Sequence, residues 1–253
     1  MTKKKLIGVH NKFKLAQRSN NEFLNMYEKT MKFMRSTFAV VAKDVRSELR
    51  TRYAMNALLM FVVISVATIL FALREEEVGI EVLSGMFWVV IFFSAMSGLS
   101  RIFVSEEERG TTMTLQLVAS PSVVYFGKLI FNCGLTLALS SAVTILYLAA
   151  FPAFIIKSMA IFILTIFLGS LGFAAAATII AAIIAKANTK GTLYPVLSFP
   201  ILIPLLMTVM KSTARALDGE IFTAALSEFQ ILASYVMIMV AGSYLLFDYV
   251  WKE

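Results

Sequence analysis

The sequence predicts an all-α membrane protein with six transmembrane helices, and three observations lead to this prediction. Hydrophobic residues make up 59% of the 253 positions and charged residues only 15%, whereas soluble domains are about 45–50% apolar and about 25% charged. Six apolar stretches have the length that a helix needs to cross a bilayer. Basic residues are concentrated near the N-terminus and in alternate connections, a pattern that orients membrane helices.

The chain before the first apolar stretch divides into two predicted parts. Residues 1–36 are polar and basic and are expected to form a cytoplasmic tail. Residues 37–53 are expected to form an amphipathic helix that lies on the inner membrane surface, with an ordinary solvated helix as the alternative. The apolar stripe of this helix consists of Phe38, Val41, Ala42, Val45 and Leu49.

The remaining residues, 54–253, are predicted to be one transmembrane domain. Connections between its spans are short except at 104–128 and 211–230. The six predicted spans, in chain order, are 54–73, 80–103, 129–151, 159–185, 192–210 and 231–250.

Several residues support these boundaries and the packing between spans. Arg101 ends the second span, Pro152 stops the third, and Trp251 closes the sixth. Gly169 and Gly172 lie in the fourth span, where small residues let helix backbones approach closely.

Polar side chains occur in the spans, but ionisable ones are almost missing from them. Ionisable residues at membrane depth usually mark proton or ion paths, so the sequence argues against a proton-coupled transporter and a charge-selective channel. The polar residues are expected to form hydrogen bonds between helices. They include Asn56, Ser65, Thr68, Ser84, Ser94, Ser97, Asn132, Ser140, Ser141 and Thr144.

The distribution of Lys and Arg predicts that both termini lie in the cytoplasm. With the N-terminus inside, 19 of the 23 basic residues fall on the inner side. The other four are Arg74, Lys157, Lys211 and Arg215. This bias follows the positive-inside rule, and contact with an anionic membrane surface explains the net charge of +7 better than nucleic acid does.

The sequence predicts no catalytic residue, no metal site and no intrinsic cofactor. His10 is the one histidine and Cys133 the one cysteine, so a histidine-based metal or haem site and a paired-thiol motif are not expected in the membrane. Gly127 and Lys128 look like the end of a phosphate-binding loop, but Ser122 stands where that loop requires Gly. A stand-alone membrane enzyme is therefore not expected.

The inner loop 104–128 is the most informative segment, because it is longer than a simple connector needs to be. An acidic cluster precedes a Gly, Thr111 or Thr112 is expected to cap a short helix, and Ser120-Pro121 ends that helix. A short helix with apolar faces on the cytoplasmic side is a docking element, with a mere connector as the alternative. The residues assigned to this role are Glu106, Glu107, Glu108, Arg109, Gly110, Thr111, Leu115 and Pro121.

Two segments of the chain resemble those of a known transporter family. The pattern Glu-x-Gly-Thr, a short helix, Ser-Pro and Gly-Lys is similar to the permeases of ABC-2 type exporters, in which this loop is the coupling helix that docks on a separate ATPase. The stretch Lys-Asp-x-Arg-x-Glu-x-Arg is closer still to the haem exporter protein B (CcmB) family of cytochrome c maturation, and the resemblance covers residues 40–250. It implies an elbow helix before the first span with Lys43, Asp44, Arg46, Glu48, Arg50 and Arg52.

The resemblance also implies a role and partners. The chain would be a permease subunit of the inner membrane that uses ATP hydrolysis by a partner subunit to export haem or to release a haem-loaded chaperone. Haem would be cargo, and ATP would bind the partner. The implied partners are a cytoplasmic ABC ATPase subunit, a Trp-rich membrane protein that handles haem, a second copy of the chain and membrane lipid, but no nucleic acid. An ABC-2 type exporter of a lipid, polysaccharide or drug is the alternative.

Overall fold

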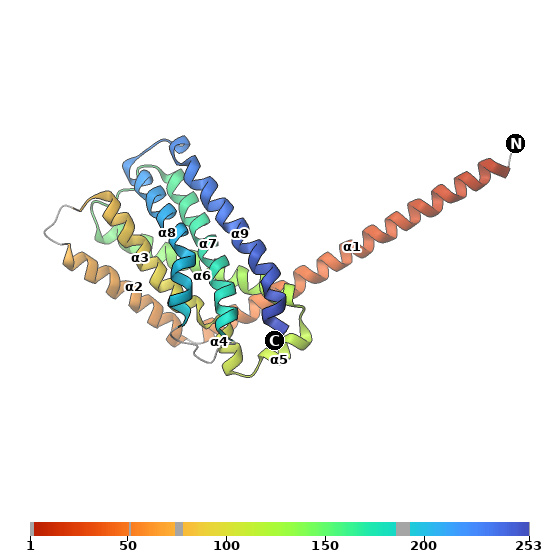
Figure 1. The fold of residues 1–253 in the computed structure, drawn as a ribbon, viewed down its shortest axis with the longest axis horizontal. Helices are drawn as coiled ribbons and strands as arrows, with labels where there is room; N and C mark the ends of the chain where they lie inside the picture. The colour runs from red at the N-terminus through yellow and green to blue at the C-terminus, as the bar shows by residue number, and fades with distance from the viewer. Residues whose placement is uncertain (1–2, 51, 74–77, 186–192, 253) are drawn as a thin grey trace.

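The structure is a computed structural model that describes residues 3–50, 52–73, 78–185 and 193–252. Long helices form a bundle, and one helix leaves the bundle sideways (Figure 1). The elements are α1 (Lys3–Arg50), α2 (Arg52–Ala72), α3 (Ile80–Leu99), α4 (Arg101–Glu108), α5 (Thr112–Val118), α6 (Pro121–Ala150), α7 (Met159–Ala185), α8 (Leu193–Asp218), the 3-10 helix η1 (Phe222–Ala225) and α9 (Leu226–Lys252).

Six helical segments of the described residues are long and apolar enough to cross a membrane, which confirms the predicted all-α membrane fold. Four boundaries differ clearly from the predicted spans. The second segment continues through α4 to Glu108. The third begins at Pro121 rather than at 129, because Ser120 is extended and Pro121 starts the helix with a preset φ angle. The fifth segment ends at Asp218 rather than at 210, and the sixth begins at Phe222 rather than at 231.

The central helix of the bundle is α7, which contacts α3, α4, α6, α8 and α9. Small residues make this possible. A Cβ atom at Gly169 would lie 2.6 Å from the Trp88 ring, and one at Gly172 would lie 2.7 Å from Leu205. The predicted role of these glycines in close helix packing is confirmed, and the buried Trp88 also donates a hydrogen bond to Thr213 on α8.

Hydrogen bonds between polar side chains connect the helices inside the bundle. Asn132 on α6 donates to Thr178 on α7 at 2.8 Å, and the hydroxyls of Ser140 and Ser170 lie 3.2 Å apart. For Asn132 and Ser140 the expected bonding between helices is confirmed. Other hydroxyls bond instead to a carbonyl one turn earlier in their own helix, as do those of Thr68, Ser94, Ser141 and Thr144.

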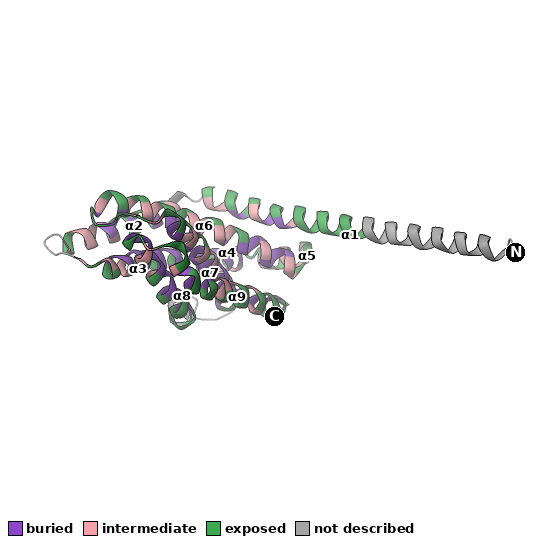
Figure 2. Ribbon diagram, turned by 90° about the horizontal axis from the view of Figure 1, so that it is seen from above, coloured by how far each residue is buried: buried purple, intermediate pink, exposed green. Residues whose placement is uncertain are grey.

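The first helix crosses one end of the bundle and extends well beyond it (Figures 1 and 2). It contacts α2 and α6. The segment expected at 37–53 is therefore, as far as Arg50, the last part of a longer helix that begins at Lys3. Figure 1 shows α4, α5 and the C-terminus at the same end of the bundle, so this end gathers the two segments that the resemblance singles out.

Candidate functional site

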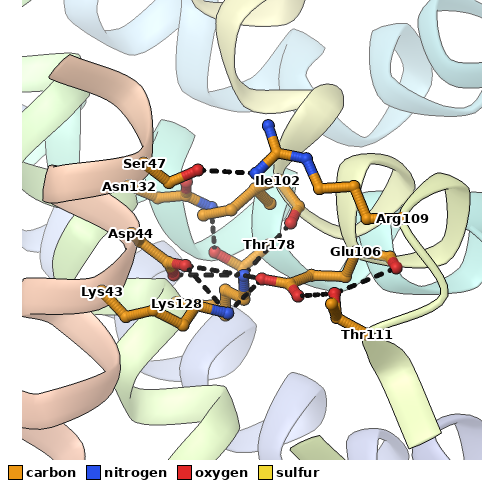
Figure 3. Close-up of polar contacts among 10 residues, drawn as sticks. All are labelled: Lys43, Asp44, Ser47, Ile102, Glu106, Arg109, Thr111, Lys128, Asn132 and Thr178. Carbon is orange, nitrogen blue, oxygen red and sulfur yellow. Dashed lines mark hydrogen bonds and ion pairs between the residues drawn. The ribbon is translucent and has the colours of Figure 1, made fainter. Parts of the chain in front are cut away.

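Four charged side chains from three helices meet where α1 joins the bundle. Lys43 and Asp44 come from α1, Glu106 from α4 and Lys128 from α6 (Figure 3). The Lys128 ammonium lies 3.1 Å from both carboxylate oxygens of Asp44 and 3.0 Å from Glu106 Oε1. Lys43 forms a further ion pair with Glu106 and lies 3.4 Å from Asp44 Oδ1. These four residues are called the charge cluster below.

The charge cluster is largely buried, and its charges balance. Lys128 is 1% exposed, Asp44 and Glu106 are also buried, and only Lys43 reaches the surface. The three donors of the Lys128 ammonium have partners in Asp44, Glu106 and the Ile102 carbonyl, which lies 3.2 Å away. Because burial of a charge is costly unless it is paired and hydrogen-bonded, Lys128 holds α1, α4 and α6 in one arrangement.

The close approach of α1 to α6 brings Asp44 to Lys128. A Cβ atom at Gly127 would lie 2.7 Å from Val40 Cγ1 and 3.4 Å from the Thr37 carbonyl. Val40 and Thr37 are buried on the same side of α1 as Asp44, one and two turns earlier. Glycine at 127 therefore lets the helices touch beside the lysine.

The turn between α4 and α5 is tied to the charge cluster. The Thr111 hydroxyl lies 2.5 Å from Glu106 Oε2 and 3.2 Å from the Glu106 carbonyl. Arg109 donates to Ser47 on α1 at 2.9 Å, and Gly110 takes the positive φ angle of 66° that the tight turn requires. Thr111, one of the two threonines expected to cap α5, is its N-cap residue, but it provides no side-chain cap, because its backbone is helical and its hydroxyl bonds to Glu106 instead.

The short helix α5 has one anchored side and one exposed side. Leu115 packs against the core of the bundle, and Gln116 donates to the Trp251 carbonyl at the end of α9. Leu117 is 88% exposed, and Met113 and Val118 are also exposed. A short apolar surface thus projects from the end of the bundle, directly after the turn that contacts the charge cluster.

The other residues predicted for the site lie around these contacts. Those whose burial the structure describes are half-buried or exposed. In the predicted docking loop, Glu107 is half-buried, Glu108 is exposed and Pro121 is the first residue of α6. In the predicted elbow helix, Glu48 is half-buried, Arg46 and Arg50 are exposed, and Arg52 is the first residue of α2 with its side chain outside the described part.

Sequence reasoning missed Lys128 and Ser47 as members of the site. By local pattern, Lys128 resembles only the end of an incomplete phosphate-binding loop. Its place between apolar residues at 123–127 and 129–131 was a usable signal, because a lysine at such depth needs a carboxylate or carbonyl partner. Nothing comparable in the sequence marks Ser47.

Among the residues that the structure describes, no group of three or more His, Cys, Asp or Glu could hold a metal ion. In the charge cluster, both carboxylates form ion pairs with lysine ammonium groups. The cluster therefore connects α1, α4 and α6.

A comparison with known protein families finds a match over most of the chain. The family model described as CcmB protein matches residues 35–245, which is most of the chain and includes the charge cluster, α5 and the bundle up to α9. A comparison with curated proteins finds no match.

Proposed function

Since this chain belongs to the CcmB protein family, we propose that it transmits the energy of ATP hydrolysis from a separate subunit to a haem exporter. Membership in this family makes it a membrane component of a haem exporter for cytochrome c maturation. It is a permease component of an ABC-type complex with other subunits and is not itself catalytic. The resemblance seen in the sequence is thereby confirmed.

The observation that carries the proposal is the link between α5 and the charge cluster. The exposed face of α5, with Leu117, would dock on the ATPase subunit. A displacement of α5 would pull on Thr111, which bonds to Glu106. Glu106 in turn holds Lys128 on α6 and Lys43 on α1, so both helices would follow the movement.

We place this complex in the inner membrane, with both termini of the chain and the segment 104–128 in the cytoplasm. The ATPase subunit binds ATP, a second copy of this chain completes the permease, and a Trp-rich membrane protein handles haem beside it. Haem is the cargo, and the energy serves its export or the release of the haem-loaded chaperone. Family membership favours haem over a lipid, polysaccharide or drug.

The test separates docking from transmission with two variants of the purified complex. Leu117→Asp places a charge on the exposed face of α5, and we expect the ATPase subunit to be lost on co-purification. Glu106→Gln weakens the bonds to Lys128 and Lys43, and we expect an assembled complex that hydrolyses ATP but no longer releases the haem-loaded chaperone.

Matched controls exist for both variants. Leu117→Met keeps the apolar face of α5, and Asp218→Asn neutralises an exposed carboxylate at the end of α8, outside the charge cluster and the segment 104–128, so both should behave like the original complex. A Leu117→Asp complex that assembles and releases chaperone normally would contradict docking through α5. Normal release with Glu106→Gln would contradict transmission through the charge cluster.

A further inference from the structure

Between Met26 and Arg50, α1 presents three different faces. The first faces the bundle, where Phe33 lies 6.0 Å from the ring of Phe126 and Val40 and Asp44 are buried. The second is an exposed apolar stripe made of Tyr27, Met31, Met34, Phe38, Val45 and Leu49. The third is exposed and basic, with Lys29, Lys32, Arg35, Arg46 and Arg50.

The apolar stripe runs along α1 at intervals of three, four and seven residues, the spacing that keeps side chains on one face of a helix. Its upstream members Tyr27, Met31 and Met34 precede residue 35, where the match to the CcmB family model begins. In the sequence, the same spacing occurs earlier with Leu6, Val9 and Phe13. The stripe therefore extends beyond the elbow segment that the family resemblance implies.

The downstream end of the stripe indicates what covers it. Val45 and Leu49 lead directly to α2, a candidate membrane span whose Leu59 and Met60 are exposed on the bundle surface. The apolar stripe of α1 and this exposed side of α2 are thus consecutive along the chain. Because α1 leaves the bundle sideways (Figure 1), its stripe can remain at the level where α2 enters the bilayer.

The charge of α1 indicates which kind of membrane surface it fits. Lys29, Lys32 and Arg35 are exposed beside the upstream part of the stripe, and Glu28 is the one acidic residue between 25 and 36. An amphipathic helix with a basic polar face binds membranes through apolar burial together with attraction to anionic lipid. The bundle-facing side of α1 is separate from the apolar stripe and from the basic face. Contact with α6 therefore leaves both of these faces accessible to lipid.

From these features we infer that the part of α1 upstream of Phe38 binds an anionic lipid surface, with its apolar stripe at the acyl boundary and its lysines and Arg35 at the lipid phosphates. This segment is a lipid anchor that lengthens the elbow helix along the membrane plane. The inference is independent of ATP coupling, because it concerns residues outside the charge cluster and α5.

The experiment uses the full-length protein in lipid nanodiscs, with Cys133→Ala so that single labels can be placed. Spin labels at Met31→Cys and, on the basic face, at Lys29→Cys form a matched pair. With phosphatidylglycerol present, we expect the label at 31 to be relaxed mainly by oxygen dissolved in lipid and the label at 29 mainly by a water-soluble nickel complex. In phosphatidylcholine alone, this difference should shrink.

A charge-reversed variant, Lys29→Glu/Lys32→Glu/Arg35→Glu, tests the lipid contact with the label at 31. Because these side chains are exposed, the variant should fold and keep its elution profile in size-exclusion chromatography. The label at 31 should become as accessible to nickel as it is in phosphatidylcholine. The inference is overturned if the label at 31 is equally accessible to nickel in both lipids. It is also overturned if the label is shielded in both and couples magnetically to the label of a second copy, since another chain would then cover the stripe.

Discussion

At the scale of single residues, Lys128 decides how three helices are held together. Its ammonium lies between the carboxylates of Asp44 and Glu106, while Lys43 balances the second negative charge from the surface. A buried ion pair contributes little net stability compared with apolar residues, but removal of one partner leaves an uncompensated charge. The cluster therefore acts mainly through the geometry that it imposes.

Replacement of the buried lysine gives the sharpest prediction at this scale. In Lys128→Met, Asp44 and Glu106 share only Lys43, and we expect the free energy of unfolding to fall by about 3–5 kcal/mol. Denaturant unfolding of the purified protein in detergent measures it. Arg46→Met removes an exposed charge of α1 and should change the same quantity by no more than about 0.5 kcal/mol.

A second substitution tests whether the pairing with Asp44 is direct. In Asp44→Asn/Lys128→Met, the lost cation is matched by a lost anion, so the double variant should be more stable than the sum of the two single effects predicts. Strictly additive losses would mean that Lys128 does not interact with Asp44 in the folded protein.

At the scale of elements, the contact between α1 and α6 depends on a single missing side chain. Gly127 faces Val40 at a distance that leaves no room for a methyl group. The ring contact between Phe33 and Phe126 lies two α1 turns away on the same side. The elbow part of α1 is thus fixed to α6 by close packing at Gly127 and by the ion pair between Asp44 and Lys128.

Two glycines of α6 allow a matched comparison of this contact. In Gly127→Ala the new methyl would collide with Val40, and we expect a loss of about 1–3 kcal/mol in unfolding free energy. Gly134 has nothing within 4 Å of an added Cβ atom, so Gly134→Ala should stabilise the helix by about 0.5–1 kcal/mol. Thermal unfolding followed by helical circular dichroism measures both, and equal shifts would rule out steric contact at Gly127.

At the scale of the whole molecule, the charged groups lie at the two ends of the bundle. The charge cluster is at the end that carries α5, whereas Lys211 and Arg215 pair with the buried Glu228 where α8 and α9 meet at the other end (Figure 1). The helices between the two ends are apolar, as a membrane span requires. The molecule therefore has two polar ends, and these lie on opposite sides of the membrane. The orientation of the chain decides which end is cytoplasmic.

Cysteine labelling tests the predicted orientation. In a Cys133→Ala background, Thr114→Cys on α5 and Ile221→Cys beside η1 are both at exposed positions. We expect a membrane-impermeant maleimide to label position 221 in intact cells, and position 114 only after the membrane is permeabilised. The reverse pattern would place α5 outside the cell and remove the basis for docking on a cytoplasmic ATPase.

Much of the fold was predictable from the sequence, because its signals are local. The length of each apolar stretch predicted six spans, and Gly169 and Gly172 predicted close packing. The motifs at 43–52 and 106–121 indicated the CcmB family, which the family match confirms. These inferences need only neighbouring residues, since a bilayer selects helices by length and apolarity alone.

The tertiary structure alone decided which of the predicted residues meet, and it added Lys128 to Lys43, Asp44 and Glu106. Lys128 meets Glu106 from 22 positions away and Asp44 from 84 positions away, and no local pattern encodes such a meeting. It arises because Gly127 lets α1 lie against α6 and because the turn at Gly110 returns Thr111 to Glu106. The sequence by itself determined the helices and their family, whereas the choice of partners for each buried charge depended on how those helices pack.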